Sequence, residues 1–224
     1  MRLGIAGGEW KKMMADATAR TRFASEVKKI IEQYDFDGVD FDFEWPANAS
    51  EYNNYSATVI QMRSTLGKYV YFTASLHPVS FKISPEAIDA LDFISYQCYG
   101  PAVMRFPYEQ FVKDGEAAVA YGIPKNKLVM GVPFYGSTGS LIAAYCDFVN
   151  DGLATTNEDT YTYKGNTYTF NSIETIRKKA RYVCEEDYAG IMSWDLATDI
   201  DITNNKSLLK VIKEEFEYYA NPTE

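Results

Sequence analysis

The sequence predicts an α/β fold built from about six βα units around a parallel sheet. Short apolar runs of strand length alternate with segments of helical period, and this alternation continues along nearly all 224 residues. No internal repeat, low-complexity tract or Ser/Pro-rich linker interrupts the chain. We therefore expect a single domain over residues 1–224.

The first half of the chain supplies four strands. The predicted elements are, in order, a strand at 2–6, a helix at 22–34, a strand at 38–43, a helix at 50–66, a strand at 70–76, a short helix from 84 and a strand at 92–99. In the first helix Phe23, Val27, Ile30 and Ile31 are expected on one face. The short helix begins at Ser84-Pro85, a favourable pair of cap and first-turn residues.

The second half continues the alternation after one interruption. Its predicted elements are a helix at 108–121, a strand at 128–134, a helix at 172–185, a strand at 190–195 and a helix at 207–219. Between 137 and 172 the pattern breaks, and residues 161–170 indicate a hairpin that turns at Lys164-Gly165-Asn166. We interpret 137–172 as a small β-hairpin insertion before the last helix-strand unit.

Composition excludes several classes of protein. The net charge of −9, without a Lys/Arg stripe, argues against a nucleic-acid partner. No apolar run approaches the roughly 20 residues needed to span a membrane, and the start lacks a signal-peptide pattern. Three cysteines at wide spacing, with one histidine and no CxxC pair, indicate free thiols rather than a disulfide framework or a zinc site. We expect no metal and no cofactor.

The segment FDGVDFDFEWP carries the clearest chemical pattern. Asp40, Asp42 and Glu44 alternate with Phe41 and Phe43, so in a strand the three carboxylates share one face. Closely spaced carboxylates in a site of low dielectric titrate together, and one holds a proton near neutral pH. A general acid for glycosidic cleavage needs that property. The alternatives are an exposed acidic strand face and a site for a hard cation.

Residues 37–44, DGVDFDFE, resemble the DGxDxDxE motif of glycoside hydrolase family 18, the chitinase family. The resemblance extends along the chain. Ala6-Gly7-Gly8 resembles the family's SxGG strand end with Ala in place of Ser, and LVMGVPFYG at 128–136 resembles the strand that carries a substrate-binding Tyr. GIMSWDLATD at 190–199 resembles the last barrel strand, and Gln97-Cys98-Tyr99 resembles the Gln-x-Tyr of plant-type members.

The resemblance implies a TIM-type (β/α) barrel that lacks two of its eight units, because the matches begin with the strand that normally comes third. We therefore expect an N-terminally short catalytic domain, prone to self-association through the gap in the barrel. It also implies site residues. Glu44 would be the general acid/base, Asp42 and Asp40 would assist it, and Tyr99 would align the substrate. Expected sugar contacts are Trp194, Tyr135, Gln97, Trp10 and Trp45.

The implied activity is retaining, substrate-assisted hydrolysis of β-1,4-linked N-acetylglucosamine in chitin or chitooligosaccharides. The alternatives are an endo-β-N-acetylglucosaminidase acting on N-glycans and a catalytically weak chitin-binding lectin. The family resemblance implies secretion.

Overall fold

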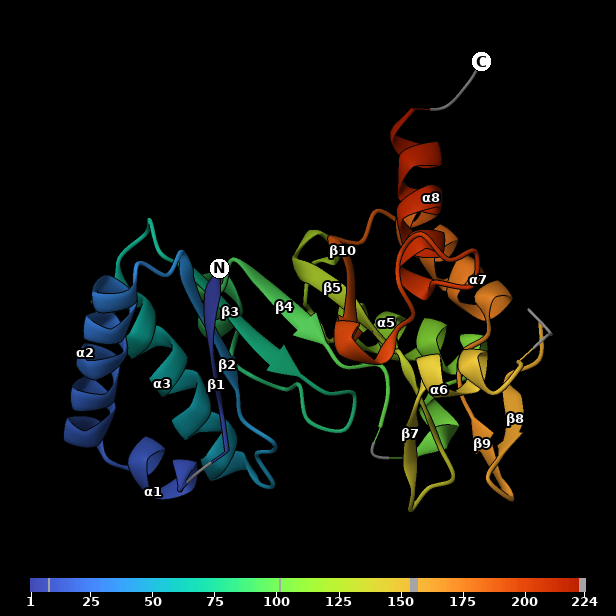
Figure 1. The fold of residues 1–224 in the computed structure, drawn as a ribbon. Coiled ribbons are helices and arrows are strands. Elements are labelled where there is room, and N and C mark those ends of the chain that lie inside the picture. The colour runs from blue at the N-terminus through green and yellow to red at the C-terminus, as the bar shows by residue number, and fades with distance from the viewer. Residues whose placement is uncertain (8, 101, 154–156, 222–224) are drawn as a thin grey trace. The chain divides into compact units, whose positions relative to one another are not determined.

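The computed structural model describes residues 1–7, 9–100, 102–153 and 157–221 (Figure 1). It comprises two compact units, which we treat separately. Unit 1 contains Met1–Tyr96 and Ala118–Leu128, and unit 2 contains Gln97–Ala117 and Val129–Glu224. The single catalytic domain expected over 1–224 stays a prediction. Among the described residues, no helix combines the length and apolar character that a membrane crossing requires.

Unit 1 contains four parallel strands and the helices that pack on them. The strands are β1 (Arg2–Ala6), β2 (Gly38–Asp42), β3 (Tyr71–Leu76) and β4 (Phe93–Tyr96), and they pair in that order. The helices are α1 (Trp10–Ala15), α2 (Ala17–Tyr34), α3 (Ala49–Leu66) and α4 (Pro85–Ala90), followed by the 3₁₀ turn η2 (Lys125–Lys127). The predicted strands 2–6, 38–43 and 70–76 are confirmed to within one residue at each end. The predicted strand 92–99 ends three residues early, at Tyr96.

Local sequence explains where these helices begin. The side chains of Asp16, Asn48 and Ser84 accept hydrogen bonds from backbone N–H groups in the first turns of α2, α3 and α4. Helices α2 and α3 lie side by side over one face of the strands (Figure 1). There Tyr55 of α3 packs on Phe41 of β2 and on Phe43 just beyond it, with ring centroids 5.2 and 5.8 Å apart. The two phenyl rings therefore face the helices.

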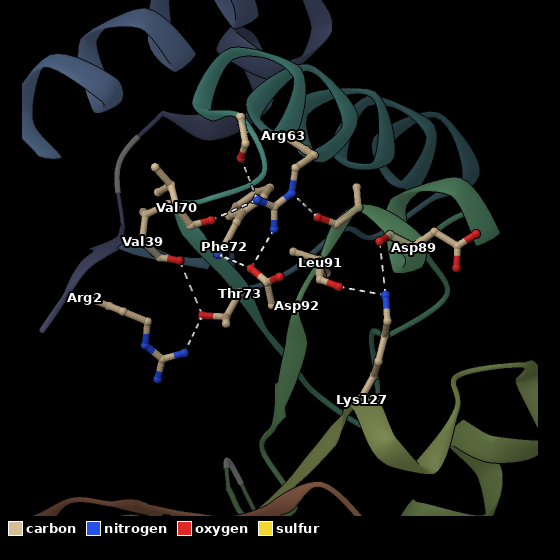
Figure 2. A network of polar contacts seen from close by, with 12 residues as sticks. Arg2, Val39, Arg63, Val70, Phe72, Thr73, Asp89, Leu91, Asp92 and Lys127 are labelled. Carbon is tan, nitrogen blue, oxygen red and sulfur yellow. Dashed lines mark hydrogen bonds and ion pairs between the residues drawn. The ribbon is translucent and has the colours of Figure 1, made fainter. Parts of the chain in front are cut away.

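Two cations hold the loops that lead into β3 and β4 (Figure 2). Arg63 donates to Asp92 Oδ2 at 2.7 Å and to the carbonyl oxygens of Gly67, Val70 and Ala90. Lys127 Nζ donates to the carbonyl oxygens of Ile88, Asp89 and Leu91 at 3.0, 3.1 and 2.8 Å. Asp92 Oδ2 also accepts from Phe72 N, so the start of β3 is tied to the residue that precedes β4. These contacts pair helix-end carbonyls that would otherwise lack donors.

Unit 2 combines a pair of parallel strands with a small antiparallel sheet. Strand β5 (Leu128–Pro133) pairs in parallel with β10 (Gly190–Trp194). The antiparallel sheet has the order β7 (Ile142–Ala144), β6 (Tyr135–Ser137), β9 (Asn166–Thr169), β8 (Thr160–Tyr163). Its helical elements are η1 (Val103–Arg105), α5 (Tyr108–Tyr121, whose last turn belongs to unit 1), α6 (Tyr145–Asn150), α7 (Ile173–Glu185), η3 (Leu196–Thr198) and α8 (Leu208–Ala220).

The predicted hairpin is confirmed as β8 and β9. Lys164 and Gly165 connect the strands with φ values of 47° and 76°. Two consecutive positive φ values are typical of the tight turns whose twist matches a hairpin. The sheet is larger than predicted, because β6 pairs with both β7 and β9.

Candidate active site

Strand β2 presents Asp40 and Asp42 on one face, and Glu44 lies two residues beyond its end. Parallel pairing places Asp40 beside Gly4 of β1 and Thr73 of β3, and it places Asp42 beside Ala6 and Ser75. Phe41 and Phe43, at 0% and 4% exposure, occupy the opposite face. Glu44 follows the strand and is exposed. The carboxylates therefore stand in a row that runs toward the carboxyl end of β2.

Gly38, within the same motif, allows this strand to start where it does. A Cβ atom on Gly38 would lie 2.0 Å from the carbonyl oxygen of Tyr71 and 2.6 Å from its Cβ. The first atom belongs to the backbone of β3 and the second is bonded to it, so neither can move without distorting the strand. Because Gly38 has no side chain, β2 can approach β3 closely at Tyr71.

Asp40 is held by two hydroxyl donors from β3. Thr73 Oγ1 donates to Asp40 Oδ1, and Ser75 Oγ donates to Asp40 Oδ2 at 2.8 Å. Hydroxyl donation to both oxygens fixes the orientation of the Asp40 carboxyl group. Neither Thr73 nor Ser75 was among the predicted site residues.

Asp42, two residues after Asp40 on β2, lies in a different environment. Burial raises the pKa of Asp42 to about 7, and the neighbouring negative charges of Glu44 and Asp40 add to that rise. No residue in the described part of the chain donates a hydrogen bond to its buried Oδ1 atom. The protonated form of Asp42 is therefore favoured relative to that of an exposed aspartate.

Trp45 and Trp10 pack against different neighbours. Trp45 follows Glu44, and its ring packs on His77 with centroids 4.9 Å apart. Trp10 contacts the rings of Phe23 and Phe41 edge-on, at 5.4 and 5.5 Å. Because Phe41 faces away from the carboxylates, Trp10 packs on the helix side of β2. The sugar-binding role expected of Trp10 stays a prediction, and these contacts give it a packing role in unit 1.

The remaining predicted residues belong to unit 2. Gln97 and Tyr99 are buried and lie beyond the end of β4 rather than within a strand. Tyr99 Oη donates to Met192 Sδ of β10 at 3.6 Å, and its ring meets that of Tyr135 edge-on at 6.4 Å. Burial raises the pKa of Tyr135 to about 12, so its hydroxyl remains a donor. Trp194, the last residue of β10, is 56% exposed.

Unit 2 thus brings Tyr99 and Tyr135 together and links Tyr99 to the strand that ends in Trp194. An exposed indole at a strand end is available to stack on a sugar ring. Within the described ranges, no group of three or more His, Cys, Asp or Glu side chains is arranged to hold a metal ion.

Comparison with known proteins identifies relatives over most of the chain. "Probable chitinase 2" of Drosophila melanogaster is 22% identical over 97% of this chain and 60% of its own length. The chain thus spans about three fifths of that relative. The crystal structure of the GH18 chitinase ChiB of Flavobacterium johnsoniae matches with a TM-score of 0.81 and 27% identity, over 96% of this chain and 74% of that one. This likeness confirms the predicted TIM-type α/β class, with six βα units in the described residues.

Solved structures with the same fold include a chitinase and a chitinase-like agglutinin. A GH18 chitinase from Cycas revoluta, solved in complex with (GlcNAc)3, has a TM-score of 0.79 and 20% identity over 96% of this chain and 81% of that one. A chitinase-like agglutinin from Robinia pseudoacacia has a TM-score of 0.78 and 18% identity over 96% of this chain and 81% of that one. Fold alone therefore does not separate enzyme from lectin. The family model of glycosyl hydrolases family 18 matches residues 2–199, and the chain belongs to that family.

Proposed function

We propose that the protein hydrolyses β-1,4-linked N-acetylglucosamine glycans, with chitin or chitooligosaccharides as the substrate class. The observation that carries the proposal is the row of carboxylates on β2, in which Asp40 is bonded by hydroxyl donors and Asp42 has its pKa raised to about 7. Glu44, at the exposed end of that row, is the proposed general acid/base.

The proposed chemistry is retaining and substrate-assisted, as the family resemblance implies. In this scheme the acetamido oxygen of the substrate attacks the anomeric carbon while Glu44 protonates the glycosidic oxygen. Glu44 then activates the water that opens the cyclic intermediate. Asp42 accepts a hydrogen bond from the acetamido N–H and stabilises the positive charge that develops on the intermediate.

Asp40 and four unit 2 residues are assigned supporting roles in the same scheme. The charge of Asp40 helps to raise the pKa of Asp42. Tyr99 and Tyr135 donate hydroxyl hydrogen bonds to the substrate. Gln97 and Trp194 complete the proposed sugar contacts, the latter by stacking beneath a pyranose ring. Trp45 is the further proposed sugar contact from unit 1.

The decisive experiment replaces Glu44 by Gln and measures turnover of a chromogenic chitobioside. We expect kcat to fall by at least about two orders of magnitude with little change in oligosaccharide binding, because general acid catalysis typically contributes that much. Glu9→Gln is the matched control, since Glu9 is an exposed glutamate paired with Lys12. Turnover of Glu44→Gln close to that of the parent would rule out the assignment.

A chitin-binding lectin is the second candidate, favoured by the shared fold of the Robinia agglutinin. The presence of Glu44 supports the enzyme. Binding of chitooligosaccharides without hydrolysis by the parent chain would favour the lectin, and glycan release from a glycoprotein would favour the endo-β-N-acetylglucosaminidase.

A further inference from the structure

The backbone that carries Glu44 lies beyond the strand ladder. Strand β2 ends at Asp42, which still pairs with Ala6 of β1 and Ser75 of β3. Glu44 lies two residues further along, in the segment 43–47, which forms neither helix nor strand. A general acid has to stay within hydrogen-bond reach of the oxygen that it protonates. The position of Glu44 therefore depends on contacts other than strand pairing.

A tight turn that follows β3 contacts this segment. His77 and Ser80 form an isolated antiparallel bridge, and Ser80 N donates to the carbonyl oxygen of His77 at 2.6 Å. Pro78 occupies the second position of the turn, where the fixed φ of proline is favourable. Val79 N donates to His77 Nδ1 at 3.1 Å and so orients the imidazole ring. The conformation of the turn is therefore fixed by its own hydrogen bonds.

The turn contacts the two residues that follow Glu44. The ring of His77 packs on the ring of Trp45, with centroids 4.9 Å apart. Ser80 Oγ donates to the carbonyl oxygen of Pro46 at 3.2 Å. Ser80 is 3% exposed, so water does not readily replace its hydroxyl in this contact. The backbone two residues after Glu44 is thus tied to the turn by a shielded hydrogen bond.

Helix α3 supports the same hydrogen bond. Tyr52 Oη donates to Ser80 Oγ at 2.9 Å. The Ser80 hydroxyl therefore accepts from Tyr52 while its single proton is directed to Pro46, and acceptance strengthens donation. Glu51, also of α3, accepts from Ala47 N at 2.8 Å through Oε2. Elements from two parts of unit 1 thus hold the end of the segment that follows Glu44.

We propose that Ser80 is a positioning residue for Glu44. Its hydroxyl, supported by Tyr52, holds the carbonyl group of Pro46 and thereby fixes the segment that presents the Glu44 carboxyl group to the glycosidic oxygen. This inference rests on the proposed function, because the position of Glu44 affects the reaction only if Glu44 is the general acid. Ser80 and Tyr52 both lie outside the motif at 37–44.

The test separates a loss of proton donation from a general loss of structure. It compares kcat/KM for phenyl chitobioside and for dinitrophenyl chitobioside. Phenolate is a basic leaving group that needs a proton in order to depart, whereas dinitrophenolate is a stable anion that departs without one. A misplaced general acid therefore slows cleavage of the phenyl substrate selectively, whereas a distorted binding site slows cleavage of both substrates.

The main variant is Ser80→Ala, which removes the hydroxyl that bonds Pro46. We expect its kcat/KM to fall by about tenfold or more for the phenyl substrate, because small displacements of a catalytic group are costly. For the dinitrophenyl substrate the fall should be less than about threefold. Tyr52→Phe, which keeps the ring and loses the donor, should change the ratio of the two kcat/KM values in the same direction and by less.

The matched control is Ser56→Ala. Ser56 is also a buried serine of unit 1, and its hydroxyl accepts from Ser84 N at 2.9 Å, so its loss should leave the ratio of the two kcat/KM values unchanged. A parental ratio in Ser80→Ala would overturn the inference, as would an equal change in Ser56→Ala. Tyr52→Phe decides the question if Ser80→Ala fails to fold.

Glu44→Gln, measured with the same two substrates, separates this inference from the proposed function. Parental turnover of both substrates by Glu44→Gln would contradict the proposed function itself. If Glu44→Gln selectively loses the phenyl substrate while Ser80→Ala and Tyr52→Phe keep the parental ratio, the proposed function stands and the positioning role of Ser80 is refuted.

Discussion

Replacing Asp42 by Asn should stabilise the protein at alkaline pH and leave its stability nearly unchanged in acid. The pKa of Asp42 is raised from 3.8 to about 7, so the folded state binds a proton more tightly than the unfolded state. Stability linked to this group is therefore fully present below about pH 4 and is lost as the pH rises through about 7. Asn cannot ionise and avoids that loss.

The size of the effect follows from the shift. A difference of about 3 units corresponds to at most about 4 kcal/mol at 1.36 kcal/mol per unit. Asp42 is half-buried rather than fully enclosed, and solvent screening reduces the expected gain to about 1–2 kcal/mol. For a chain of this size, that gain corresponds to a rise in Tm of about 2–8 °C at pH 8.

The assay is a series of thermal unfolding curves from pH 4 to pH 8 for the parent and for Asp42→Asn. Asp40→Asn is the matched control, because the same substitution there replaces a carboxylate that accepts from Thr73 and Ser75. We expect Asp40→Asn to lose stability at pH 8. A difference in Tm between Asp42→Asn and the parent that stays constant across this pH range would refute the reasoning.

Two further predictions concern the mechanism and the fold. A thiazoline analogue of N-acetylglucosamine should inhibit competitively, because it resembles the cyclised intermediate of a substrate-assisted reaction; intact hydrolysis at millimolar inhibitor would instead indicate a protein nucleophile. Gly38→Ala should destabilise the chain by about 1–3 kcal/mol in urea unfolding, because its Cβ would collide with the backbone of Tyr71. Gly4→Ala is the control, since a Cβ there meets no atom within 4 Å, and equal effects of the two would count against the collision.

Most elements were predictable because their signals are local. The cap residues Asp16, Asn48 and Ser84 and the positive-φ turn at Lys164-Gly165 act within a few residues of the chain. Helix α1 was missed because it has only 6 residues and its first turn has no side-chain cap. A helix that short has no internal pattern to detect.

The end of β4 was misplaced for a different reason. The apolar run continues past Tyr96 through Cys98 and Tyr99, so periodicity alone favours a longer strand. Strand β3 ends at Leu76, and Leu76 pairs with Tyr96. The ladder with β3 therefore stops where its partner stops, which is information that no local window of sequence contains.

Local sequence also fails to distinguish the two aspartates of the candidate active site. Spacing places Asp40 and Asp42 on one face of β2, with Glu44 beyond the end of the strand, but it treats the two aspartates alike. They differ through their partners on β1 and β3, which are distant in the sequence, and through the nearby charge of Glu44 on Asp42.

The neighbouring strands decide which aspartate receives hydrogen bonds from hydroxyl groups. On β1 the residues beside the two aspartates are Gly4 and Ala6, neither of which can donate from a side chain. On β3 both hydroxyls, from Thr73 and Ser75, are directed to Asp40. No residue in the described part of the chain donates a hydrogen bond to Oδ1 of the half-buried Asp42, and burial raises its pKa to about 7. The motif supplies closely spaced acids, and the register of β2 with its neighbours gives the two aspartates different environments.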